Sequence, residues 1–484
     1  MAVNNRRSLL LAAGLWTSAE LQAHSFAEVV TLPLPFWLYA WGSAAALLLS
    51  FLLLALLGGQ PSPCRAGRDV GQHRLIRLLR ASRLKPLLQL LGVAALLLCI
   101  ATGLWGNRSP YGNFNMTFFW IVFLLGFSYA SALLGNFYAA LNPWRSLCAG
   151  VNALLPAYDR PRLQWPHWLG YWPALALYMG LIWLELLGPA SPYALSTALL
   201  GYSLLNLVAV AMFGSDQWFR YGELFSVLFG LLAQLSPVDY RPARRGGAGH
   251  WRLRRPLTGL LTWRVSHVSL LAFILFMLSS TAFDGLHETL IWKKWFWLEL
   301  YQQLLREFSS ANPLAAFPQM RQWFVYWQNS WLLLSLAVYL VAYLLALMLG
   351  RWLAGGRSLR ELALHFAPAL LPIVLVYHFA HYYTLIQTQG VKIVSLISDP
   401  FGRGDNFFGT AQWLQRQLLP DTTTVWHVQL ASILLGHMAS VWIAHRLAQR
   451  YYRTPRQVVL SQLPMLVLML LLTTGGLWIL SQPR

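Results

Sequence analysis

Ten long apolar stretches constrain this chain more than any other feature of its sequence. Each approaches or exceeds the roughly 20 residues that a helix needs to cross the hydrocarbon core of a bilayer. Hydrophobic residues make up 57% of the chain and charged residues only 11%, whereas about 25% of a typical soluble domain is charged. The sequence therefore predicts an all-α, polytopic membrane protein with about ten transmembrane helices, at 35–57, 87–106, 116–137, 168–188, 193–213, 259–281, 327–350, 364–387, 425–448 and 459–480.

The loops between these stretches differ in their content of Lys and Arg. If the mature N-terminus is outside, the inside loops (58–86, 138–167, 214–258, 351–363 and 446–456) carry 24 Lys and Arg and the outside segments carry 9. Because cytoplasmic loops are enriched in Lys and Arg, this bias predicts an N-out, C-out topology. The net charge of +20 is then explained by membrane orientation, and we expect a lipid bilayer and no nucleic acid as a partner.

One apolar run does not fit the length of a transmembrane helix. Residues 224–235, which follow Glu223 and precede Pro237, are too few to cross the bilayer. If this run did cross, every later loop would change sides and the Lys and Arg bias would disappear. We therefore expect an interfacial or re-entrant helix there.

The N-terminus is typical of a bacterial signal peptide. A basic segment, "NNRR", precedes a short apolar core, "SLLLAAGLW", and a polar tail, "TSAELQA". This order predicts a signal peptide over 1–23 with cleavage after Ala23, so that His24 begins the mature chain; an uncleaved anchor or another cleavage position is the alternative. We expect residues 24–484 to form a single polytopic domain in the bacterial inner membrane.

Several familiar chemistries have no sequence signature here. The three cysteines, Cys64, Cys99 and Cys148, form no CxxC spacing, so neither a disulfide framework nor a thiolate metal site is expected. The chain also contains no GxxxxGK[ST] phosphate loop, no GxSxG and no HExxH. Any active site must therefore be assembled from other residues.

Two histidines lie inside an apolar run, in the segment "YHFAHYYTL". His378 and His381 are three residues apart and so share one face of a helix. Ionisable groups within a bilayer are costly and often functional. In the predicted topology both lie in the outer half of their span, so we expect them to face a polar cavity that opens to the periplasm or exterior.

Further metal-ligating and acidic residues are expected near that cavity. "FDGLHE" places Asp284 at the outer end of a span, and the loop "SDPFGRGDNFFGT" offers Asp399 and Asp405. His437 lies near the middle of the run 425–448, and a terminal His24 could chelate with its α-amino group and its ring. Imidazole and carboxylate ligands suit zinc, copper, manganese or iron, with zinc or copper expected.

Each of these residues also has a purely structural explanation. Paired histidines can hydrogen-bond to neighbouring helices, Asp399 before a proline can shape a turn, and Asp284 can cap a helix. His437 can be a packed polar contact, and Glu185 can pair with Arg264 or a backbone group. The sequence alone leaves these alternatives open.

Several short segments along the chain are distinctive as sequence: "AHSF", "LPLPFWLYAWG", "LNPWR", "FDG", "AHYYTL", "SDPFG", "NFFGTA" and "GHMAS". In these segments the chain resembles a family of bacterial multi-pass membrane proteins known as fenitrothion hydrolases, which are organophosphorus hydrolases. The resemblance implies cleavage of an aryl phosphorothioate ester and extends over nearly the whole chain. The positions that match the family are His24, His381, His437, His445, Asp284 and Asp399. His378 is a candidate because it shares a helical face with His381, and not because of the resemblance.

Three functions follow as hypotheses. The first is a metal-dependent hydrolase of a hydrophobic organophosphorus ester, in which His24, His378, His381 and His437 are metal-ligand candidates and Asp284, Asp399 and Asp405 are catalytic candidates. The second is a copper- or zinc-binding membrane protein without hydrolase activity. The third is a small-solute transporter that uses Glu185, Arg264 and His437 as polar groups within the membrane.

Overall fold

The protein is an all-α, multi-pass membrane protein, as the sequence predicts. The computed structural model describes residues 35–57, 67–74, 84–241, 250–310, 312–356, 358–413 and 421–483. Within these ranges nine helices or continuous helical stacks are long and apolar enough to cross a membrane. They are α2 (Phe36–Leu57), α4 (Leu84–Trp105), the stack α5–η2–α6 (Phe114–Met116, Thr117–Gly126 and Phe127–Leu134), α10 (Pro192–Phe213), α14 (Val268–His287), α16 (Pro313–Ala354), the stack α17–η6–α18 (Leu359–Phe366, Ala367–Leu370 and Leu371–Thr388), α20 (Thr422–Tyr451) and α21 (Pro455–Ser481).

Shorter elements connect these helices and pack between them. They are η1 (Pro110–Gly112), α7 (Tyr138–Leu141), α8 (Pro143–Leu154), α9 (Trp172–Leu186), α11 (Ser215–Gln217), η3 (Trp218–Gly222), α12 (Leu224–Leu232), α13 (Thr258–Thr262), α15 (Leu290–Lys294), η4 (Trp295–Leu305), η5 (Arg306–Phe308), η7 (Gly390–Lys392) and α19 (Ile393–Ser398), with strands β1 (Arg68–Asp69), β2 (Val238–Arg241) and β3 (His250–Leu253). η2, η3 and η4 are π-helices.

Two of the predicted runs differ from a full-length span. The run 168–188 forms α9, which has only 15 residues, but it extends along α14 from Ser269, which contacts Tyr171, to Asp284, which is linked to Glu185 through Tyr382. Pro173 lies in its first turn, and the sequence Gly188–Pro189 follows its end. The run 224–235 forms α12, with 9 residues, so the prediction that it is too short to cross agrees with the structure.

The sixth run is displaced along the chain relative to its prediction over 259–281. Residues 258–262 form the separate helix α13, and α14 begins at Val268. The side chain of His267 caps α14 by accepting a hydrogen bond from the backbone N–H of Ser269. As a result Asp284 lies in the last turn of α14 instead of in the loop after it.

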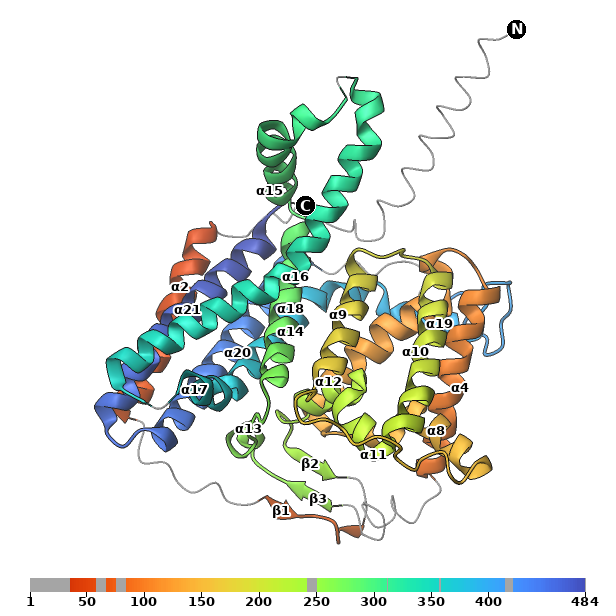
Figure 1. The fold of residues 1–484 in the computed structure, drawn as a ribbon, viewed down its shortest axis with the longest axis horizontal. Coiled ribbons are helices and arrows are strands. Elements are labelled where there is room, and N and C mark those ends of the chain that lie inside the picture. The colour runs from red at the N-terminus through yellow and green to blue at the C-terminus, as the bar shows by residue number, and fades with distance from the viewer. Residues whose placement is uncertain are drawn as a thin grey trace.

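α14 is the central helix of the bundle and is buried along almost all of its length. One side of α14 faces a group of packed helices formed by α16, α18, α20, α21 and α2 (Figure 1). The other side faces α9, and beyond α9 lie α12, α10 and α4 (Figure 1). Residues on α14, α18 and α9 can therefore meet inside the bundle, although these helices are far apart in the sequence.

Contacts between loops agree with the predicted alternation of sides. A small antiparallel sheet of order β1-β3-β2 joins two loops predicted to be inside (Figure 1). Two other predicted inside loops meet where the Tyr452 hydroxyl donates to the carbonyl oxygen of Gly355. Two predicted outside segments meet where the backbone N–H of Asn107 donates to Phe401. Each pair of loops thus lies at one end of the bundle.

Candidate functional site

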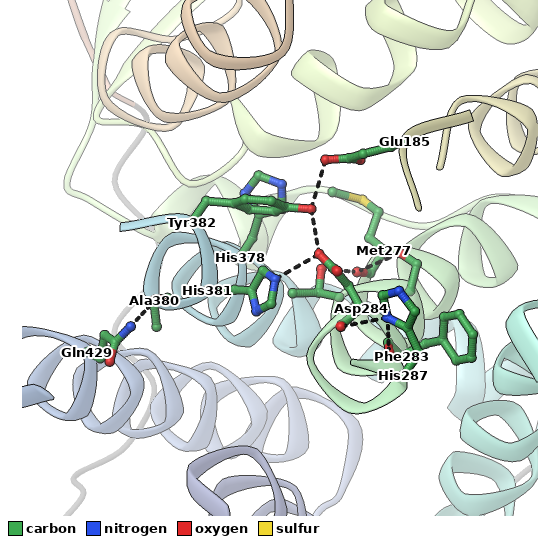
Figure 2. A network of polar contacts seen from close by, with 12 residues as sticks. Glu185, Met277, Phe283, Asp284, His287, His378, Ala380, His381, Tyr382 and Gln429 are labelled. Atoms are coloured by element: carbon green, nitrogen blue, oxygen red, sulfur yellow. Dashed lines mark hydrogen bonds and ion pairs between the residues drawn. The ribbon is translucent and has the colours of Figure 1, made fainter. Parts of the chain in front are cut away.

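An acid–base pair joins α14 to α18 in the interior of the bundle. His381 Nε2 lies 2.7 Å from Asp284 Oδ2, and the two side chains are only 11% and 9% exposed (Figure 2). The carboxylate can accept and the ring can donate, so this contact is a charge-assisted hydrogen bond. Two residues singled out from the sequence are therefore direct partners.

Tyr382 extends this pair to a third helix. Its hydroxyl oxygen lies 2.8 Å from Asp284 Oδ2 and 2.9 Å from Glu185 Oε1 (Figure 2). Glu185 belongs to α9, on the opposite side of α14 from α20 and α21 (Figure 1). Residues from α9, α14 and α18 thus form one connected polar cluster.

His378 lies on the same helix as His381 but has a different partner. Its Nδ1 is 3.0 Å from the hydroxyl oxygen of Tyr129, which α6 provides. The ring centroids of His378 and Tyr382, one helical turn apart, are 4.8 Å from each other. His378 therefore borders the cluster while its Nδ1 is engaged by α6.

A small cavity lies beside this cluster. Glu185, Asp284, His378 and Tyr382 line it together with Ser128, Tyr178, Ser280, Thr281 and apolar side chains of α9, α12, α14, α18 and the η2–α6 segment. The space open to the centre of a water molecule is about 20 Å³, and one buried water needs about 10–15 Å³ on that measure. The cavity can hold one or two water molecules and offers them polar partners.

A glycine on α14 allows a neighbouring helix to approach the site closely. A Cβ atom built at Gly285 would lie 2.7 Å from Ile479 Cγ2 of α21 and 3.7 Å from His381 Nδ1. The first distance is too short for a real contact, so a side chain at this position would displace Ile479. Gly285 therefore lets α14 and α21 close around His381.

His437 lies on α20 and is not among the residues that line the cavity. Its side chain is 1% exposed, and Nδ1 is 2.8 Å from the carbonyl oxygen of Ile433, one turn earlier. Because a carbonyl only accepts, Nδ1 carries the hydrogen. Nε2 of His437 has no hydrogen-bond partner among the described residues.

His445, further along α20, contacts the side chains of Gln449 and Gln462.

Asp399 organises its own loop. Its two carboxylate oxygens accept hydrogen bonds from the backbone N–H groups of Arg403 and Gly404, at 2.9 and 2.8 Å. Gly404 has a φ of +91°, which favours glycine in this turn. Asp405 is half-buried in the same loop. Neither aspartate lines the cavity, so the turn-shaping explanation describes the observed contacts of Asp399.

The predicted metal ligands do not converge in the described part of the chain. There, no group of three or more His, Cys, Asp or Glu side chains is arranged to hold a metal ion. His381 Nε2 is engaged by Asp284, and His378 Nδ1 by Tyr129. His24 and the predicted signal peptide 1–23 lie outside the described residues. The donors that are described do not by themselves fit the predicted zinc or copper site.

Sequence reasoning missed two partners of the cluster. Tyr382 and Tyr129 were not singled out, and the partners considered for Glu185 were Arg264 or a backbone group. The available signal was the position of Tyr382 next to His381 in an apolar run, because a buried tyrosine hydroxyl usually has a hydrogen-bond partner. Comparison with known proteins adds no assignment to this geometry, since no family model, curated protein or solved structure matches the chain.

Proposed function

We propose that the protein is a membrane-embedded hydrolase of apolar organophosphorus esters, with its site on the periplasmic side of the bacterial inner membrane. The observation that carries this proposal is the buried Asp284–His381 pair, with Asp284 at a cavity of water size. The sequence resemblance to organophosphorus hydrolases supports the same substrate class, an aryl phosphorothioate ester.

In this proposal Asp284 is the base. Its carboxylate takes a proton from a water molecule in the cavity, and the resulting hydroxide attacks phosphorus. The bond from phosphorus to the aryl oxygen breaks, and the aryl oxide leaves. His381 is a positioning residue, because its Nε2–H group holds Asp284 Oδ2 at 2.7 Å and favours the ionised carboxylate. General base catalysis of this kind contributes about 10²–10⁴-fold to a rate.

The size of the cavity sets a requirement for this mechanism. It accommodates one or two water molecules, which is much less than an aryl ester occupies. Some of the helices that line the cavity must therefore separate before the phosphorus centre can reach Asp284. An apolar ester dissolved in the bilayer can approach these helices directly.

A divalent zinc or copper ion remains a prediction from the sequence. Two measurements test it. Intact-mass analysis of the mature protein determines whether the chain begins at His24. Elemental analysis of the purified protein, before and after chelation, determines whether zinc or copper is bound. Bound metal without ester turnover would favour the alternative of a metal-binding membrane protein.

The hydrolase is tested by turnover of a chromogenic aryl phosphotriester by purified protein in lipid nanodiscs. We expect wild-type turnover that Asp284→Asn lowers by about 10²-fold or more. Asp216→Asn is the matched control, because Asp216 is exposed and lies in α11, apart from the cluster. Absence of wild-type turnover, or equal turnover in Asp284→Asn, would reject the proposal.

The polar cluster also favours a second candidate, a proton-coupled transporter of a small solute. Glu185 links to Asp284 through Tyr382 within the membrane-spanning bundle, and such intramembrane carboxylates are common in proton-driven transporters. Proton flux into proteoliposomes, measured with an enclosed pH-sensitive dye, tests this. Flux that Tyr382→Phe abolishes would support the transporter, and flux at the level of empty liposomes would reject it.

A further inference from the structure

Three short contacts in the polar cluster require three hydrogen atoms. They are His381 Nε2 to Asp284 Oδ2 at 2.7 Å, Tyr382 oxygen to Asp284 Oδ2 at 2.8 Å, and Tyr382 oxygen to Glu185 Oε1 at 2.9 Å. A hydroxyl has one hydrogen to donate, and an ionised carboxylate has none. Tyr382 therefore cannot donate to both Asp284 and Glu185.

With His381 Nε2–H as a donor, each contact has its own hydrogen only when one of the two carboxyl groups is protonated. In the first assignment His381 Nε2–H and the Tyr382 hydroxyl both donate to Asp284 Oδ2, and Glu185 donates from a protonated carboxyl group to the Tyr382 oxygen. If Asp284 carries the proton instead, its Oδ2–H group donates to Tyr382, Tyr382 donates to Glu185, and His381 still donates to Oδ2. The donors decide between the two assignments, because hydrogen bonds to a carboxylate favour its ionised form. Asp284 has both His381 and Tyr382 as donors, whereas the described partner of Glu185 is Tyr382 alone, so the geometry favours a protonated Glu185.

Another buried glutamate shows the contrasting case. Glu223 accepts hydrogen bonds from the backbone N–H groups of Phe225 and Ser226, from Asn142 Nδ2 and from the Tyr202 hydroxyl. Each of these four donors supplies its own hydrogen, so Glu223 needs none to satisfy its contacts. The requirement for an added proton is therefore specific to Glu185 and is not a general result of burying a glutamate.

The groups facing Glu185 are consistent with a neutral carboxyl. They are Tyr382 and His378 of α18, Asp284 of α14, Tyr178 of its own helix and the serines and threonine of the cavity wall. Among the residues that the structure describes, neither Lys nor Arg lines this cavity, so none of them supplies a permanent positive charge that stabilises a carboxylate there. A protonated carboxyl avoids placing a second negative charge beside Asp284.

We propose that Glu185 is a proton-binding site of the membrane domain, which holds its proton at neutral pH and donates it to Tyr382. Transfer from this site needs no other reactant. The Glu185 proton moves to the Tyr382 oxygen as the Tyr382 proton moves to Asp284 Oδ2, leaving an ionised Glu185, a neutral Asp284 and an unchanged tyrosine. The site therefore stores one proton at the cavity, and this inference does not depend on the proposed hydrolase activity.

Infrared spectroscopy of the purified protein in nanodiscs at neutral pH tests the site directly. A protonated carboxyl has a C=O stretch that is separate from carboxylate bands and shifts in D₂O. The spectrum of wild type minus that of Glu185→Gln should contain this band. Glu299→Gln is the matched control, because Glu299 is exposed on η4, and its difference spectrum should contain carboxylate bands instead.

A second variant keeps the test decisive if Glu185→Gln fails to fold. In Tyr382→Phe the acid loses the oxygen to which it donates, so the protonated-carboxyl band should persist and move to higher frequency. A wild-type spectrum without a protonated-carboxyl band would overturn the inference. So would a band that neither substitution alters, since it would belong to another residue.

Discussion

Replacement of His381 by alanine separates a structural role of the Asp284–His381 pair from a functional one. The substitution removes one of the two short hydrogen bonds to Asp284 Oδ2, while the bond from Tyr382 remains. Removing a hydrogen-bond donor from a buried polar group costs about 1–3 kcal/mol, and more when the group is charged. Because the acceptor is a buried carboxylate that keeps only the bond from Tyr382, we expect a loss of about 3 kcal/mol.

The assay is thermal unfolding in nanodiscs together with turnover of the aryl phosphotriester at matched concentrations of folded protein. A loss of about 3 kcal/mol leaves a membrane protein of ordinary stability, about 5–15 kcal/mol, folded at room temperature. Turnover per folded molecule should nevertheless fall by about 10²-fold, because Asp284 loses the group that orients it.

His381→Gln distinguishes the two roles. The glutamine Nε2 can donate to Asp284 at a similar position, so this variant should recover most of the stability without an imidazole ring. His167→Ala is the matched control, because His167 is exposed in a loop. Our reasoning would be refuted if His381→Ala kept both wild-type stability and wild-type turnover.

Three further predictions concern packing, pH dependence and topology. Gly436→Ala should destabilise the protein by about 1–3 kcal/mol in thermal unfolding, because a Cβ there would lie 2.1 Å from Val376 Cγ2; unchanged stability would mean that α18 and α20 pack less closely. Hydrogen bonds from the Thr424 backbone and hydroxyl lower the pKa of Asp421, which caps α20, so its stabilising effect should be complete at neutral pH and be lost as the pH falls below about 4. Asp421→Asn should remove that acid dependence, and an unaltered acid limb of the unfolding curve would contradict it. In intact cells, a membrane-impermeant thiol reagent should label Glu307→Cys but not Asp239→Cys, and the reverse pattern would invert the topology.

The sequence alone determined most of the helical architecture. Hydropathy is a local property, and a run of about 20 apolar residues has few alternatives to a helix in lipid, where every backbone polar group must be satisfied within the segment. The same length requirement predicts that the short run of α12 does not cross the bilayer. The start of α14 was misplaced because the side-chain cap of His267, and not the apolar run, decides it.

Part of the polar cluster was also visible in the sequence. His378 and His381 were identified because ionisable side chains are rare in apolar runs and costly in a bilayer, and Asp284 because it lies at the outer end of a span. The first reason also selected His437, and nearness to the outer end of a span also selected Asp399; neither residue lines the cavity. Rarity identifies residues that need partners, but it does not say which partner each one has.

Only the tertiary structure decided how these residues combine. Glu185 and Tyr382 are 197 residues apart in the sequence, yet their side chains are 2.9 Å from each other. Their meeting depends on the rotation and depth of α9 and α18 around α14. Lipid solvates one apolar face of a helix as well as another, so hydropathy does not determine how a helix is rotated. Close packing and small residues such as Gly285 determine these rotations.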